Sequence, residues 1–199
     1  MEPHVDGFHI DVMDNHFVPN LTVGLQFIWA ITQVITKPLW IHLMVDNPHD
    51  WIEKLSIPKN SIISFHYEAI KSGDKIEKIT EIIQAHGYIA SVAINPATPL
   101  ENLLPYLGVI QHALIMSVQP GYSGQPFIKS SIEKIKELQE YVTTHSLRVI
   151  LAIDGGVNKY NIKQLAQAGV TDFAVGSAIF STDNENLTQA ISEIKKLVV

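Results

Sequence analysis

The chain has 199 residues, is 46% hydrophobic and 17% charged, and carries a formal net charge of −6, which fits one acidic globular domain with a substantial core. This charge, and the lack of any block of Lys and Arg, argues against a nucleic-acid-binding surface. The lack of cysteine excludes disulfides and thiolate metal ligands. The first residues do not have the pattern of a signal peptide, and no apolar run could span a bilayer, so we expect a cytoplasmic protein without a membrane partner.

The first predicted element is a strand over residues 7–14. Its residues alternate, so that His9, Asp11 and Met13 share one face while the other face is apolar. One interpretation is a half-buried strand whose polar face is solvated. The other is a strand that projects metal ligands into the mouth of a parallel barrel.

Strands and helices alternate along the rest of the chain. Further strands are expected at 39–45, 62–67, 88–94, 113–118, 148–153 and 172–175. Helices are expected at 24–36, 48–55, 71–85, 126–144, 158–168 and 184–198, with another starting at Thr98–Pro99. These seven βα repeats with nearly continuous apolar strands indicate a parallel sheet covered by helices.

The predicted fold class is α/β, a parallel barrel of the (β/α)₈ TIM-barrel type with only seven βα units visible. An open doubly wound sheet is the alternative, but the glycine-rich fingerprint that usually follows its first strand is missing. Polar residues at the ends of many strands favour the barrel. Because a barrel needs eight units, either one unit is absent from the N-terminus or the fold closes in another way.

Four potential metal ligands arise from the ends of three predicted strands: His9, Asp11, His42 and Asp154. Taken singly, each could be a hydrogen-bonded core histidine or a loop-capping aspartate. Their recurrence at one end of one architecture favours a site for a divalent ion. Imidazole together with carboxylate suits Zn²⁺, Fe²⁺, Mn²⁺ or Co²⁺ more than Mg²⁺ or Ca²⁺.

A second pair of polar residues, His66 and Glu68, lies on the third predicted strand. We interpret these residues as supporting the metal ligands or facing the substrate. They are also the residues most able to replace one member of the proposed ligand set.

Glycines cluster after three of the predicted strands, at 120–125, at 155–156 and at 175–178. A glycine pair after a strand is usually a tight turn. Glycines also let backbone N–H groups approach an anion, and a helix starting near Gly176 and Ser177 would point its positive end at that anion. Because barrels often bind phosphate between their last two strands, these clusters favour a phosphorylated ligand.

Several motifs together resemble the ribulose-phosphate 3-epimerase family, in unbroken order over essentially the whole chain. They are HIDVMDNHFVPN (9–20), HLMV (42–45), FHYEA (65–69), NPATP (95–99), MSVQPGYSGQ (116–125), DGGV (154–157) and GSAIF (176–180). The resemblance implies a metal-dependent enzyme of the pentose phosphate pathway that interconverts D-ribulose 5-phosphate and D-xylulose 5-phosphate through a 2,3-enediolate. It implies one divalent ion held by the residues at positions 9, 11, 42 and 154.

The resemblance also implies residue roles. Asp11 and Asp154 match the catalytic pair of proton-transfer groups, which fits a reaction that removes a proton from one face of C3 and returns one to the other. The residues that match the family's substrate contacts are Met13, His42, Met44, Met116, Gly121, Gly124, Gly155, Gly156, Gly176 and Ser177.

One departure from the family lies at the N-terminus, where no residues match its usual first strand and helix or the serine of that strand. We therefore expect residues 1–199 to form a single ribulose-phosphate-binding barrel domain that lacks the first βα unit. Two uncovered strand edges would invite a partner chain, so a homo-oligomer is expected. Whether such a shortened chain turns over substrate stays open.

Two alternatives compete with this prediction. One is a 3-epimerase for a six-carbon ketose phosphate, and the other is a catalytically impaired barrel that only binds a sugar phosphate or a metal. The Asp-x-Lys-x-x-Asp pattern of the orotidine-decarboxylase-like barrels is absent, because Met13 stands where the lysine should be.

Overall fold

Seven parallel strands form one sheet in the computed structural model, which describes residues 2–71, 75–180 and 186–198. The strand order follows the sequence, from β1 to β7, and each strand pairs in parallel with the next. The strands are β1 (Phe8–Met13), β2 (Leu39–Met44), β3 (Ile62–His66), β4 (Ile89–Ile94), β5 (His112–Met116), β6 (Ile150–Asp154) and β7 (Asp172–Ala174).

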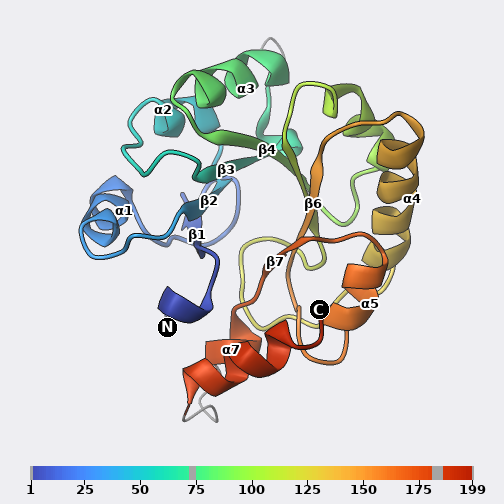
Figure 1. Cartoon of the computed structure of the whole chain (residues 1–199). Coiled ribbons are helices and arrows are strands. Elements are labelled where there is room, and N and C mark those ends of the chain that lie inside the picture. Colours follow the sequence, from blue (N-terminus) through green and yellow to red (C-terminus); the bar gives the residue numbers. More distant parts are fainter. Residues whose placement is uncertain (1, 72–74, 181–185, 199) are drawn as a thin grey trace.

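Helices surround this sheet on its outer side (Figure 1). The α-helices are α1 (Leu25–Thr32), α2 (Pro48–Ile52), α3 (Ile76–Ala85), α4 (Ser131–Thr144), α5 (Ile162–Gln167), α6 (Ser177–Phe180) and α7 (Leu187–Lys195). Short 3₁₀ helices are η1 (Glu2–His4), η2 (Tyr67–Ala69), η3 (Leu100–Asn102) and η4 (Leu104–Tyr106). None of the helices in these described ranges is both long and apolar enough to cross a membrane.

The seven strands make a nearly closed barrel, which confirms the predicted α/β fold with seven βα units. Within the described part of the chain, no ladder joins β7 back to β1. Helix α7 and the segment before β1 meet beside this seam, where Lys195 Nζ lies 2.8 Å from Asp6 Oδ2.

Two layers of buried side chains explain why the strands are nearly continuous apolar runs. The outward-facing residues, such as Ile41, Leu43 and Ile63, pack against the helices in the main core. Inside the barrel, smaller residues and Trp40 fill the space. Below the barrel mouth, the Trp40 indole N–H donates to Ser64, and hydrogen bonds continue to Ser91 and His112.

Several predicted helices are shorter in the structure, among them 24–36 and 158–168, which are helical over Leu25–Thr32 and Ile162–Gln167. Two further differences have a clear local cause. The expected helix at Thr98–Pro99 is instead a pair of 3₁₀ helices, because Pro105 has no N–H to continue an α-helical ladder. The long helix begins at Ser131 and not at 126, since the Ile128 N–H donates to the Ser117 carbonyl at 2.8 Å and holds the preceding chain across the end of β5.

Candidate active site at the carboxyl ends of the strands

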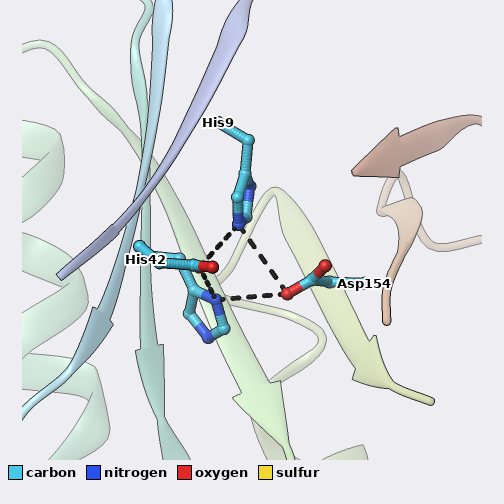
Figure 2. Close-up of side chains that lie close together, drawn as sticks. His9, His42 and Asp154 are labelled. Carbon is cyan, nitrogen blue, oxygen red and sulfur yellow. Dashed lines mark hydrogen bonds and ion pairs between the residues drawn. The ribbon is translucent and has the colours of Figure 1, made fainter. Parts of the chain in front are cut away.

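Four polar side chains converge at the mouth of the barrel. His9 and Asp11 extend from β1, His42 extends from β2, and Asp154 ends β6. The register of β1 and β2 places Asp11 directly beside His42. Figure 2 shows the side chains of His9, His42 and Asp154 pointing toward one another from separate strands. The inward direction of alternate residues in parallel strands thus brings together groups that lie far apart in the sequence.

The ligand atoms of these residues form a closed ring. Asp11 Oδ1 lies 3.0 Å from His9 Nε2 and 3.1 Å from His42 Nδ1. Asp154 Oδ2 lies 3.7 Å and 3.5 Å from the same two nitrogens. All four atoms lie within 4.8 Å of one another. Ligands held about 2.1 Å from a tetrahedral Zn²⁺ lie about 3.4 Å apart, so the donor set fits one divalent ion.

The surroundings of the ring change the pKa values of His42 and Asp11. Burial alone would lower the pKa of His42, but its hydrogen bonds to Asp11 and Asp154 and their negative charges raise it to about 9. Burial opposes ionisation of Asp11, yet His9 and His42 hold the pKa of this carboxyl well below its ordinary value. The site therefore favours an ionised Asp11, and an ionised carboxylate is the form that binds a cation.

His66 and Glu68 lie behind His42 and not in the ring. His66 Nε2 is 2.9 Å from His42 Nε2, and His66 Nδ1 is 3.1 Å from Glu68 Oε2. Burial lowers the pKa of His66, so its ring is neutral at pH 7. The sequence left open whether this pair supports the predicted ligands or faces the substrate, and the structure places His66 in contact with His42.

A cleft opens directly above the ring of ligands. Among the predicted substrate contacts it is lined by Met13, Met44, Met116, Gly121, Gly124, Gly155, Gly156, Gly176 and Ser177, together with Asp11 and Asp154. The remaining predicted contact, His42, is fully buried beneath the cleft. Sequence reasoning missed Val118, Val157 and Ala174 in the lining. Their position next to strand ends could have indicated them, but small apolar residues there usually only pack.

The loop at 119–125 forms one wall of the cleft and rests on the loop after β1. The Asn20 side chain donates to the Gly121 carbonyl at 2.9 Å, and the Tyr122 hydroxyl donates to the Pro19 carbonyl at 3.1 Å. Gln125 folds back to the Gln119 carbonyl at 2.6 Å. The contacts of Asn20 and Tyr122 join two segments about one hundred residues apart.

The turn after β6 requires glycine at position 155. Gly155 has a φ of +113°, and a Cβ added there would lie 2.5 Å from Val118 Cγ2 and 2.9 Å from the Val118 backbone nitrogen. Because both the backbone conformation and the space exclude a side chain, Asp154 and the wall of the cleft depend on this glycine.

Gly155→Ala should therefore destabilise the protein by about 2 kcal/mol or more, from the combined cost of strain and overlap. Urea unfolding followed by circular dichroism measures the change. Gly108→Ala is the matched control, because nothing lies within 4 Å of its added Cβ and its φ is not in the left-handed region. Equal unfolding midpoints for the two variants would contradict the packing described for Gly155.

The fold and the site together define a TIM-barrel protein with a His/Asp cluster at the carboxyl ends of its strands and a glycine-lined cleft above it. The chain belongs to the ribulose-phosphate 3-epimerase family, whose model matches residues 1–180.

Relatives support this assignment. The chain is 39% identical over 182 residues to a ribulose-phosphate 3-epimerase of Mycobacterium bovis, covering 90% of this chain and 77% of that one. It is 36% identical over 191 residues to a ribulose-phosphate 3-epimerase of Escherichia coli K12, covering 96% and 83%.

Solved structures resemble the chain in fold alone. A 3-hexulose-6-phosphate synthase superposes with a TM-score of 0.67 at 13% identity, over 99% of this chain and 89% of that one. KGPDC from Streptococcus mutans superposes with a TM-score of 0.63 at 13% identity, over 96% of both chains.

Proposed function

We propose that the protein is a metal-dependent epimerase that interconverts D-ribulose 5-phosphate and D-xylulose 5-phosphate within one sugar-phosphate-binding barrel domain. Family membership supports the reaction class. The observation that carries the mechanism is the ring of two imidazoles and two carboxylates beneath the cleft. The same reaction would place the protein in the pentose phosphate pathway.

His9, Asp11, His42 and Asp154 would hold the divalent ion, which their chemistry indicates is Zn²⁺, Fe²⁺, Mn²⁺ or Co²⁺. When bound, such an ion supplies positive charge that stabilises the negative charge developing on the oxygens beside C3. The protein's part is to keep Asp11 ionised and to orient both rings toward one point. The low pKa of Asp11 supports this role.

Asp11 and Asp154 would exchange the proton at C3. They extend from β1 and β6, and each turns a single oxygen toward both histidines, Oδ1 for Asp11 and Oδ2 for Asp154. The second oxygen of each carboxylate is then available to the substrate. In one direction of the reaction, an ionised aspartate removes the proton from one face of C3 to give the 2,3-enediolate, and the other aspartate, protonated at the start, donates its proton to the opposite face.

Three methionines line the space between the two aspartates. Met13, Met44 and Met116 are 6%, 2% and 1% exposed and contribute apolar surface to the cleft. A thioether carries no exchangeable proton and is polarisable. These side chains would therefore exclude water from the enediolate without protonating it, which limits loss of the intermediate.

The substrate phosphate would bind at the ends of β6 and β7. Gly155 and Gly156 follow β6, and Gly176 and Ser177 follow β7, so both segments face the same side of the cleft. Backbone N–H groups without side chains nearby can approach phosphate oxygens closely. The loop at 119–125 would cover the sugar between this end and the ring of ligands.

Solvent exchange tests this function. With Zn²⁺, Mn²⁺ or Co²⁺ present, D-ribulose 5-phosphate incubated in D₂O should take up deuterium at C3 and yield D-xylulose 5-phosphate, as followed by NMR and mass spectrometry. Faster exchange with a six-carbon ketose phosphate would instead identify the other epimerase. Tight binding of ribulose 5-phosphate without exchange would contradict an enzymatic role and identify a sugar-phosphate-binding barrel.

A further inference from the structure

We propose that Glu68 and His66 are positioning residues for His42. Two consecutive hydrogen bonds, between His42 and His66 and between His66 and Glu68, keep the lone pair of His42 Nδ1 directed toward the proposed metal site. This inference rests on the metal site of the proposed function and adds two residues outside the donor set. It concerns how the ring of His42 is oriented, and which of its nitrogens is protonated, before any substrate binds.

The first hydrogen bond joins two fully buried rings. His42 turns Nδ1 toward Asp11 and Nε2 toward His66, whose Nε2 lies 2.9 Å away. The two ring planes are inclined by only 22° and the ring centroids are 5.0 Å apart. The rings therefore meet edge to edge, so that an N–H of one points along the plane of the other. With both side chains 0% exposed, water cannot take the place of either partner.

The second hydrogen bond joins His66 Nδ1 to Glu68 Oε2 at 3.1 Å. The other oxygen of Glu68, Oε1, accepts from the Asn95 N–H at 2.7 Å and from the Thr98 hydroxyl. Glu68 is thus anchored by the segment after β4, at a distance from the metal ligands. These two hydrogen bonds fix the orientation of the Glu68 carboxylate, and the carboxylate in turn fixes the orientation of the His66 ring.

The direction of both hydrogen bonds follows from the chemistry of imidazole. A nitrogen that binds a metal must present a lone pair, so His42 Nδ1 is unprotonated in the loaded site and Nε2 carries the hydrogen. His66 must then accept at Nε2, and a neutral ring that accepts at one nitrogen donates at the other. Its Nδ1–H donates to the Glu68 carboxylate, which can only accept when ionised. Glu68 therefore favours the one arrangement of hydrogens on the two rings in which His42 Nδ1 is unprotonated and can bind a cation.

His9 has no comparable support. Its Nε2 faces the ring of ligands, but its Nδ1 is buried without a hydrogen-bond partner within the described residues. The ring of His9 is instead held by an edge-on contact with Trp40, with centroids 4.5 Å apart. His42 is consequently the better oriented of the two imidazole ligands, and changes at Glu68 should act through it.

Glu68→Gln tests the direction of the hydrogen bonds with almost no change in shape. The glutamine oxygen can keep the Asn95 and Thr98 hydrogen bonds, which turns its NH₂ group toward His66 Nδ1. This NH₂ group would then face the Nδ1–H of His66 unless the hydrogen of His66 moves to Nε2. A hydrogen on His66 Nε2 would in turn face the Nε2–H of His42. We expect the dissociation constant for Zn²⁺, measured by competition with a chromophoric chelator, to rise about 10- to 100-fold. Glu81→Gln, on the exposed face of α3, is the matched control and should leave it unchanged.

Two substitutions at His66 separate positioning from packing. A glutamine oxygen can occupy the place of the Nε2 atom, so His66→Gln should retain most of the affinity for Zn²⁺. His66→Phe keeps a ring but offers no acceptor, and should lose about as much affinity as Glu68→Gln. Adding Glu68→Gln to His66→Phe should cause no further loss of affinity for Zn²⁺, since the hydrogen bond between His42 and residue 66 is already absent. Additive losses would indicate separate structural effects and would overturn the proposal.

Histidine ¹⁵N NMR reads the protonated nitrogen directly. In the metal-free and Zn²⁺-loaded proteins, His66 should carry its hydrogen on Nδ1, and Glu68→Gln should shift it to Nε2. The proposal is overturned if His66 carries the hydrogen on Nε2 in the native protein, or if Glu68→Gln binds Zn²⁺ as tightly as the native protein. If the native protein binds no Zn²⁺ at all, the proposed metal function fails, and the tautomer of His66 in the metal-free protein still decides the present proposal.

Discussion

Asp154→Asn and Asp11→Asn should each lower the rate of C3 epimerisation by about 10³- to 10⁴-fold, since each removes a proton-transfer group from one side of the cleft. An asparagine amide keeps the shape of the side chain but cannot accept a proton. The two carboxylates extend from different strands, β1 and β6, so neither can take the position of the other. A coupled assay for xylulose 5-phosphate formation measures the loss.

The two variants should differ in which epimer still exchanges. If each aspartate serves one face of C3, the surviving carboxylate removes the proton from one epimer only. Deuterium exchange should then be better retained with ribulose 5-phosphate in one variant and with xylulose 5-phosphate in the other. Asp50→Asn, whose side chain is 61% exposed in α2, is the control and should act as the native protein does. The same exchange preference in both variants would contradict a two-base mechanism.

Removal of the divalent ion should have the second large effect. Stripping the protein with a strong chelator should abolish measurable epimerisation, and added Zn²⁺, Mn²⁺ or Co²⁺ should restore it. Mg²⁺ should restore less, because two of the four ligands are imidazoles. Binding to the native state alone should also raise the free energy of unfolding by about 2.7 kcal/mol when the ion is present at one hundred times its dissociation constant.

His42→Ala provides the comparison for that experiment. This variant removes one ligand, so a chelator should change neither its unfolding midpoint nor its residual activity. Lys136→Ala, an exposed change in α4, should respond to the chelator as the native protein does. Full activity of the chelator-treated native protein would contradict a metal-dependent reaction.

The barrel could be predicted from the sequence because its strands are buried on both faces. Runs such as 39–45 and 88–94 are apolar apart from His42 and Ser91, which distinguishes them from the amphipathic helices between them. The residues at which the helices begin were harder to predict from the sequence. Pro126 is a residue typical of a first helical turn, but the nearby Ile128 N–H donates to the Ser117 carbonyl at the end of β5, and the helix begins only at Ser131.

Much of the site could also be predicted from the sequence, because residues two apart on a strand share a face and the ends of parallel strands meet. This reasoning singled out the histidines and aspartates that the structure brings within 4.8 Å. It could not decide the place of His66, which depends on the register of β2 and β3. It also missed Lys134, which donates to the carbonyls of Asn95, Pro96 and Thr98 and braces the segment that anchors Glu68. A lysine in an amphipathic helix gives no sign of such a role.

The most direct test is a crystal structure of the metal-loaded protein with anomalous scattering measured at the absorption edge of the added Zn²⁺ or Co²⁺. A single anomalous peak should lie about 2.0–2.2 Å from His9 Nε2, His42 Nδ1 and one oxygen of each of Asp11 and Asp154. A peak between His66 and Glu68, or no peak at the barrel mouth, would contradict the assignment of these four residues to one shared ion.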